Sequence, residues 1–182
     1  PNVFIQDATG GLELFKYTGS PVEVGKHISG TIIGTYTLYN GTPEINSGAT
    51  YNLTVSDGDA AEPAVVTIDE LVAKQNAYIC KLIKIENASY AGGQIRQEGN
   101  TNTVKPYNTF MTLPTEWPET FDITGVCIIY NNTTLEIAPR IADDIVRKGG
   151  KINPTLTFAP EEVIAYLDAL DEFNAPVLTT DP

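Results

Sequence analysis

The chain has 182 residues, of which 42% are hydrophobic and 19% charged, so it can bury one or two modest cores and is not predicted to be disordered. Eleven Lys and Arg stand against 23 Asp and Glu, and the resulting net charge of −12 disfavours nucleic acid as a partner. No apolar run reaches the roughly 18–20 residues that a membrane-spanning helix needs. The chain does not begin with Met, and we expect it to be part of a longer protein.

The first third of the sequence predicts short strands separated by turn residues. A Gly-rich turn after Asp7 separates two apolar segments and predicts a hairpin. A later Asn40-Gly41 pair predicts another tight turn. The predicted strands are 3–7, 12–17, 27–39, 44–46 and 51–55.

The polar segment that ends at Pro63 marks a boundary, after which one helix and further strands are predicted. Thr67 and Glu70 match a capping box, in which a hydroxyl and a carboxylate cap the first helical turn, so we predict a helix over 68–74. The predicted strands of this part are 78–85, 94–97, 108–113, 122–130 and 135–137.

One phrase occurs twice in the chain. Residues 28–45 and 123–137 both begin Ile-(Ser/Thr)-Gly, continue through β-branched residues, and end in Tyr-Asn-(Gly/Asn)-Thr followed by Glu-Ile. The two glycines, Gly30 and Gly125, are 95 positions apart, which is the length of a small domain rather than of a solenoid repeat. We therefore predict two related β-domains in tandem.

Five short strands with a glycine in the fourth are typical of a small Greek-key barrel of the OB type, because a strand that bends around a small barrel favours a residue without Cβ. The first copy has no counterpart of the strand 78–85, so we expect it to lack its opening strand unless another segment takes that place. The predicted fold class is mainly β. The predicted parts are an N-terminally incomplete barrel over 1–58, a linker over 59–66, a second barrel over 67–150, and a tail over 151–182 with one helix and extended segments.

The turn Gln6–Gly11, the Val24-Gly25 pair and the phrase 28–45 resemble the OB-fold-like domains of Bacteroidetes surface lipoproteins, related to those that accompany extracellular nucleases and phosphatases. The segment 175–179 is similar to the opening strand of bacterial Ig-like repeats, so the tail is expected to begin such a domain. The resemblance implies an extracellular or cell-surface location. It implies no single function, because OB barrels carry many unrelated ligands. In the second copy the matching residues are 123–125, 130–131, 136–139 and 143–145.

The sequence offers little for catalysis or metal binding. Cys80 and Cys127 lie in apolar segments, where two buried thiols or one disulfide are both compatible with the pattern. His27 is the single histidine, so the sequence contains no Cys/His zinc cluster. It lies at the start of a predicted strand beside Lys26, and we identify no Ser/His/Asp arrangement that includes it. We expect a protein without enzymatic activity, metal or cofactor.

Aromatic side chains are the better candidates for a binding site, since saccharides and bases both stack on flat rings, and OB barrels present such groups on their second and third strands. The alternative places Phe15 and Tyr107 in core or interdomain packing and Trp117 as a plug in a loop. We expect a non-catalytic spacer or binding module of a secreted or surface-anchored bacterial protein, with a glycan or other domains of the same chain as partner. An accessory nucleic-acid-binding module of an extracellular nuclease is the alternative function. The candidate binding residues are Phe15, Tyr17, Arg96, Tyr107 and Trp117.

Overall fold

A computed structural model describes residues 1–149, of which 45% lie in strands and 8% in helical turns. The prediction of a mainly β chain is therefore confirmed. The tail predicted over 151–182, with its helix, its extended segments and its likeness to an Ig-like strand, lies outside the described residues.

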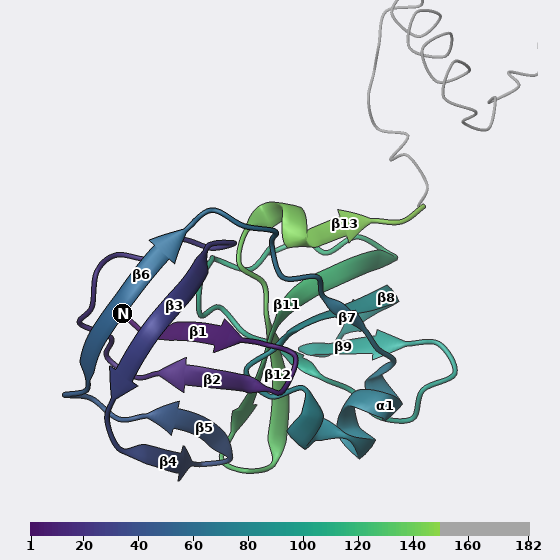
Figure 1. The fold of residues 1–182 in the computed structure, drawn as a ribbon. Helices are drawn as coiled ribbons and strands as arrows, with labels where there is room; N and C mark the ends of the chain where they lie inside the picture. The colour runs from purple at the N-terminus through teal and green to yellow at the C-terminus, as the bar shows by residue number, and fades with distance from the viewer. Residues whose placement is uncertain (150–182) are drawn as a thin grey trace, which may run out of the picture. The chain divides into compact units, whose positions relative to one another are not determined.

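Residues 3–56 supply six strands, which we call the first strand set (Figure 1). Four of them form a sheet in the order β1-β2-β5-β4, in which β2 and β5 are parallel. The other two, β3 and β6, form a separate antiparallel pair. The strands are β1 (Val3–Gln6), β2 (Gly11–Leu14), β3 (His27–Ile33), β4 (Tyr36–Tyr39), β5 (Thr42–Ile45) and β6 (Thr50–Ser56).

The two predicted turns of the first strand set are confirmed, and local chemistry explains both. The Asp7 carboxylate accepts hydrogen bonds from the amides of Thr9 and Gly10 and from the Thr9 hydroxyl, which closes the β1–β2 turn and lowers the pKa of Asp7. At the β4–β5 turn, Asn40 and Gly41 have φ angles of 49° and 92°. These left-handed conformations are those that a two-residue hairpin loop requires.

The strand predicted over 27–39 is two strands rather than one. The strand is interrupted at Gly34, where a Cβ atom would lie 2.6 Å from Ile45 and 2.7 Å from Ala49. After this close approach β4 pairs with β5, whereas the preceding β3 pairs with β6. Gly30 lies opposite Leu53 in that pair, and a side chain there would collide with the carbonyl oxygen of Asn52.

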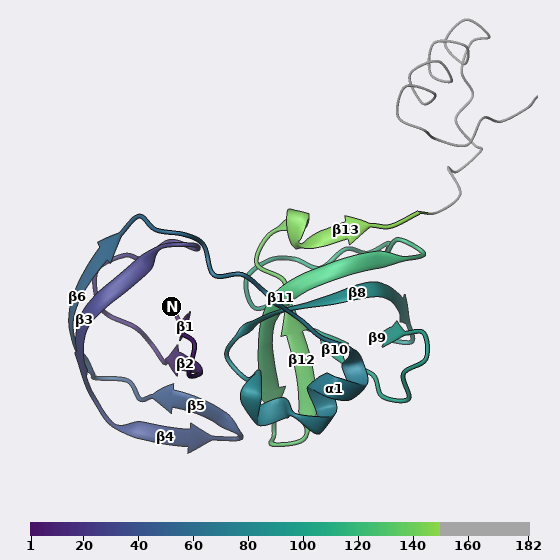
Figure 2. The same ribbon diagram turned by 45° about the vertical axis from the view of Figure 1, so that its right-hand side comes forward.

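Residues 64–147 form the second strand set around a seven-stranded sheet (Figure 2). Its main order is β10-β12-β11-β8-β7, with β9 added to β8 and β13 added to β11. An isolated bridge between Ile95 and Val104 links β9 to the residue before β10. The strand pairings therefore form a closed circuit, from β8 to β9, through this bridge to β10, and then through β12 and β11 back to β8. The elements are β7 (Ala64–Val65), α1 (Ile68–Ala73), η1 (Gln75–Ala77), β8 (Leu82–Ala91), β9 (Gln94–Gln97), β10 (Lys105–Pro106), β11 (Phe121–Tyr130), β12 (Thr134–Ala138), η2 (Ala142–Asp144) and β13 (Ile145–Arg147).

Two strands of the second set differ from their predictions. The strand expected over 78–85 begins only at Leu82, because the preceding residues form turns and Cys80 has a φ of 63°. The strand expected over 108–113 is absent, and the described chain there forms bends. The parallel pairing of β10 with β12 instead ends at Tyr107, whose amide donates to the carbonyl of Ile137.

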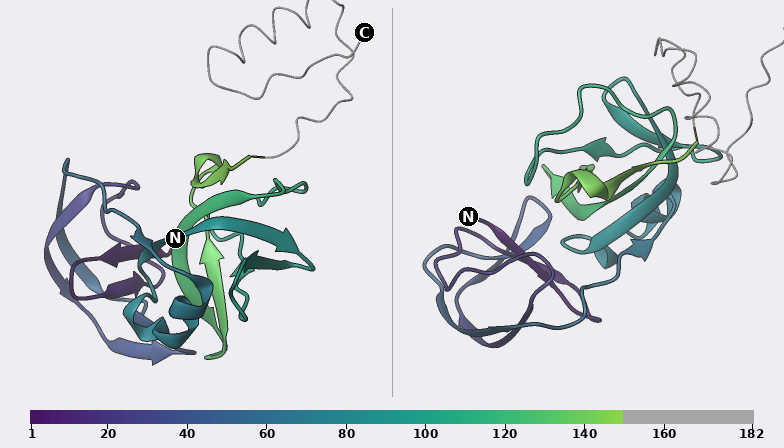
Figure 3. Two further views of the ribbon diagram at one scale, coloured as in Figure 1. Left: turned by 90° about the vertical axis from the view of Figure 1, so that its right-hand side faces the viewer. Right: turned by 90° about the horizontal axis from the view of Figure 1, so that it is seen from above.

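The main hydrophobic core lies inside the second strand set. Ile68 and Leu71 of α1 are fully buried in the same cluster as β-branched and aromatic residues of β8 and β11. These two strands have ten residues each and are strongly curved (Figure 3). Gly125 lies at the middle of β11, where a Cβ would lie 2.7 Å from the backbone of Ala138. The strand members of the cluster include Ile83, Ile85, Ala88, Ile95, Phe121, Ile123 and Cys127.

Hydrogen bonds and ring contacts join the two strand sets, which both belong to the compact unit Pro1–Gly150. The Gln6 side chain accepts from the amide of Leu82 at 2.6 Å, and the amide of Asn132 donates to the carbonyl of Asn40 at 2.9 Å. Phe4 meets Phe110 edge to face, with ring centroids 5.7 Å apart. The turns of the two repeated phrases are thus in direct contact.

Candidate functional site

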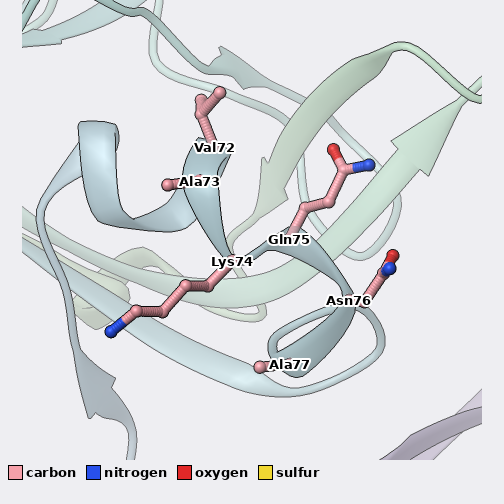
Figure 4. A pocket seen from close by; sticks show the side chains of 6 residues that line it. All are labelled: Val72, Ala73, Lys74, Gln75, Asn76 and Ala77. Atoms are coloured by element: carbon pink, nitrogen blue, oxygen red, sulfur yellow. The ribbon is translucent and has the colours of Figure 1, made fainter.

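A shallow pocket follows the chain from the end of α1 through η1 (Figure 4). Its volume is about 490 Å³, and it is lined by the consecutive residues 72–77. In the close-up, the amides of Gln75 and Asn76 project on one side of the chain and the ammonium of Lys74 on the other. Lys74 is also paired with Glu70, at 3.0 Å, so its charge is turned toward the helix.

A second pocket of about 250 Å³ shares Val72 and Gln75 with the first. Its other lining residues come from the start of β9, from the loop before β10, and from the end of the β11–β12 turn with the first residues of β12. None of its lining residues carries a charge, although the chain has a net charge of −12. We call it the amide pocket, and it is lined by Val72, Gln75, Gln94, Asn102, Thr103, Thr133, Thr134 and Leu135.

Asp69 fixes one wall of the amide pocket. Its carboxylate accepts hydrogen bonds from the amides of Thr101 and Asn102 and from the Asn102 side chain, at 2.8–3.1 Å. In the opposite direction, the backbone amide of Asp69 donates to the side-chain oxygen of Asn100 at 2.9 Å. These bonds favour the ionised carboxylate and lower the pKa of Asp69. The first turn of α1 therefore positions the loop that presents Asn102.

Glu70 holds the other end of the helix against η1. Thr67 caps α1 by accepting from the amide of Glu70, which confirms the hydroxyl half of the predicted capping box. The predicted bond from the amide of Thr67 back to the Glu70 carboxylate is not found among residues 1–149. The Glu70 carboxylate itself accepts from Lys74 at 3.0 Å and from the hydroxyl of Tyr78 at 3.1 Å, and these bonds lower its pKa. This network joins α1 to the turn that lines the first pocket.

Two of the five sequence-predicted binding residues lie in the first strand set. Tyr17 is 5% exposed, meets Tyr51 edge to face at 4.5 Å and donates to the carbonyl of Ser20, so its ring is part of the packing. Phe15 is half-buried, and the ammonium of Lys16 lies 5.1 Å from its ring centre. Of these two residues, Phe15 is the more exposed.

The other three lie in the second strand set. Trp117 is half-buried between Tyr90, on which it stacks at 4.5 Å, and Phe121, at 5.1 Å. Tyr107 is 42% exposed, with Lys105 over its ring. Arg96 is exposed on β9, two positions from the pocket residue Gln94. Among residues 1–149, no aromatic or cation–π contact joins two of the five candidates.

A buried pair of carboxylates was not predicted from the sequence. Glu13 of β2 lies beside Glu44 of β5 in parallel register, and the two residues are 8% and 6% exposed. Burial raises the pKa of Glu13, the negative charge of Glu44 raises it further, and a hydrogen bond from Asn2 opposes this rise; burial likewise raises the pKa of Glu44. The repeated Glu-Ile ending was the signal that could have directed attention to Glu44.

The two cysteines are free thiols, and both are buried. Burial raises the pKa of Cys127 to about 12. The pKa of Cys80 is also raised, chiefly by burial and then by the charges of Glu13, Cys127 and Glu44. Because the thiolate is the reactive form, burial and a raised pKa both lower the reactivity of these thiols at neutral pH.

No family model, curated protein sequence or solved structure matches the chain. Within residues 1–149, no helix combines the length and the apolar character that crossing a membrane would require. Over the same residues, no three His, Cys, Asp or Glu side chains gather in a way that could hold a metal ion.

Proposed function

We propose that the chain is a non-catalytic binding and spacer module of a secreted or surface-anchored bacterial protein, built from two OB-type barrels, and that its ligand is a neutral saccharide. The extracellular location follows from the resemblance to Bacteroidetes surface lipoproteins. Different observations support the barrels and the ligand.

The strand pairings support the barrel proposal. In each set the repeated phrase ends in an antiparallel hairpin. The second strand of that hairpin also pairs in parallel with another strand, which gives β2 beside β5 in the first set and β10 beside β12 in the second. In each set an antiparallel strand lies opposite the phrase glycine, with Leu53 facing Gly30 and Ile83 facing Gly125. We propose that β6 takes the place of the opening strand in the first barrel, which the sequence left without one.

The amide pocket is the observation that carries the saccharide proposal. Its amides and hydroxyls both donate and accept hydrogen bonds, as sugar hydroxyls require. Val72 and Leu135 add apolar surface for the C–H face of a sugar ring. An uncharged pocket in an acidic chain favours a neutral ligand, because a negatively charged ligand would be repelled by the surrounding field.

Titration calorimetry against a panel of neutral mono- and oligosaccharides tests this proposal. Gln75→Ala removes an amide shared by both pockets that makes no side-chain hydrogen bond within residues 1–149. We expect it to weaken binding at least about tenfold, which corresponds to roughly one hydrogen bond.

Asn108→Ala is the matched control, since Asn108 is an exposed amide outside both pockets. Binding that is equally weakened by both variants would contradict the assignment to the amide pocket. A flat titration of the unsubstituted chain across the panel would remove the saccharide proposal and leave the spacer role.

A further inference from the structure

Two buried carboxylates, Glu13 and Glu44, lie where the first strand set contacts the Cys80 turn, and neither forms an ion pair within residues 1–149. Glu13 and Glu44 are direct neighbours on parallel strands, whose spacing is about 4.8 Å. Asn2 donates to Glu13 at 2.6 Å.

The second strand set shows how the same position is neutralised elsewhere in this chain. Glu136 matches Glu44 in the repeated phrase, and its parallel neighbour is Lys105. The Lys105 ammonium lies 3.3 Å from the Glu136 carboxylate. Where the second strand set has a cation beside this glutamate of the phrase, the first has a second acid.

The groups around Glu13 and Glu44 belong to both strand sets. Cys80, in the turn before β8, has its thiol 3.8 Å from the carbonyl of Pro43, the residue before Glu44. A side chain at Gly11 would meet the backbone of Cys80, so β2 lies directly on this turn. The charge of Glu44 raises the pKa of Glu13, and both carboxylates in turn raise the pKa of the Cys80 thiol.

We propose that Glu13 and Glu44 together bind one proton, and that losing this proton loosens the contact between the first strand set and the Cys80 turn. Two buried carboxylates at neighbouring register positions repel each other when both are ionised, and binding one proton removes this repulsion. The pair would act as a pH-sensitive latch, separate from the saccharide pocket proposed above.

The sign of the pH dependence follows from the raised pKa of each carboxyl. The folded chain holds the proton more tightly than the unfolded chain does, so the contribution to stability is complete below the ordinary glutamate pKa of 4.5. It is lost as the pH rises through the folded-state pKa. Each unit by which folding raises the pKa corresponds to a tenfold change in the unfolding equilibrium constant.

Urea unfolding of the chain between pH 5 and 8.5 tests the latch. We expect the stability of Glu44→Gln, and separately of Glu13→Gln, to fall less than that of the unsubstituted chain as the pH is raised. At pH 8 each variant should have an unfolding equilibrium constant about tenfold smaller than that of the unsubstituted chain. Glu98→Gln is the control, because Glu98 is exposed, and it should keep the original pH profile.

Alkylation of Cys80, followed by peptide mass spectrometry, tests the location. The labelling rate of Cys80 is first corrected for the pH dependence of alkylation of a free thiol. The corrected rate should rise with pH in the unsubstituted chain and stay constant in Glu44→Gln. Identical pH profiles for the two chains in both measurements would overturn the proposal. Calcium or sodium that stabilises the unsubstituted chain at pH 8, but not Glu44→Gln, would also overturn it, since the site would then bind a metal cation.

Discussion

Gly125 and Gly10 differ in what a single added methyl group would meet. A Cβ at Gly125 would lie 2.7 Å from the backbone of Ala138 on the neighbouring β12, whereas nothing lies within 4 Å of the same position at Gly10. Gly125→Ala should therefore destabilise the chain by about 1–3 kcal/mol, as overpacking in a core does. Urea unfolding should show this loss, while Gly10→Ala stays within about 0.5 kcal/mol of the parent. Equal stabilities for the two variants would contradict the close approach.

Asp69 gives a second prediction at the scale of one residue. Removing its carboxylate by Asp69→Ala leaves the amides of Thr101 and Asn102 without their acceptor. We expect faster hydrogen exchange at both amides, and weaker saccharide binding if Asn102 contributes to the pocket as proposed. Asp143→Ala, at an exposed carboxylate away from this loop, should leave both amides protected.

At the scale of elements, α1 depends on its cap. The helix has six residues, too few to be stable alone, so the Thr67 hydroxyl and the burial of Ile68 and Leu71 must hold it in place. Thr67→Ala should lower the free energy of unfolding by about 1 kcal/mol, and Thr67→Ser should restore most of the loss. If the alanine variant unfolded at the same urea concentration as the parent, the cap would not contribute.

Sequence predicted the elements whose cause is local. The Asp7 turn, the Asn40-Gly41 turn and the Thr67 cap each arise from residues within a few positions of one another. The interruption at Gly34 depends on Ala49, and the late start of β8 depends on a hydrogen bond between Cys80 and Cys127. These neighbours are distant in the chain, so no local sequence pattern predicts either feature.

The amide pocket could not be predicted for a related reason. It gathers uncharged polar residues from four separate segments, and such residues form no motif until the fold brings them together. Aromatic residues were the visible candidates, but the sequence could not distinguish a packed ring such as Tyr17 from an exposed one such as Tyr107.

At the scale of the whole molecule, the charge balance makes a prediction that needs no pocket. With a net charge of −12, the chain should not be retained on immobilised single-stranded DNA even at about 20 mM salt, where phosphate contacts are strongest. Retention that falls as salt is added would instead support the accessory nucleic-acid-binding function. A basic single-stranded DNA-binding protein run on the same column provides the positive control.

The position of β6 after the hairpin, rather than before it, has a consequence for the order of folding. Gly30 and Leu53 are 23 positions apart, whereas Gly125 and Ile83 are 42 apart. Closing the longer loop costs about 0.5 kcal/mol more in chain entropy. Because shorter loops close at lower entropic cost, β3 and β6 should pair early, before β8 meets β11. Conservative substitutions at Leu53 should then mainly slow folding, and those at Ile83 should mainly speed unfolding.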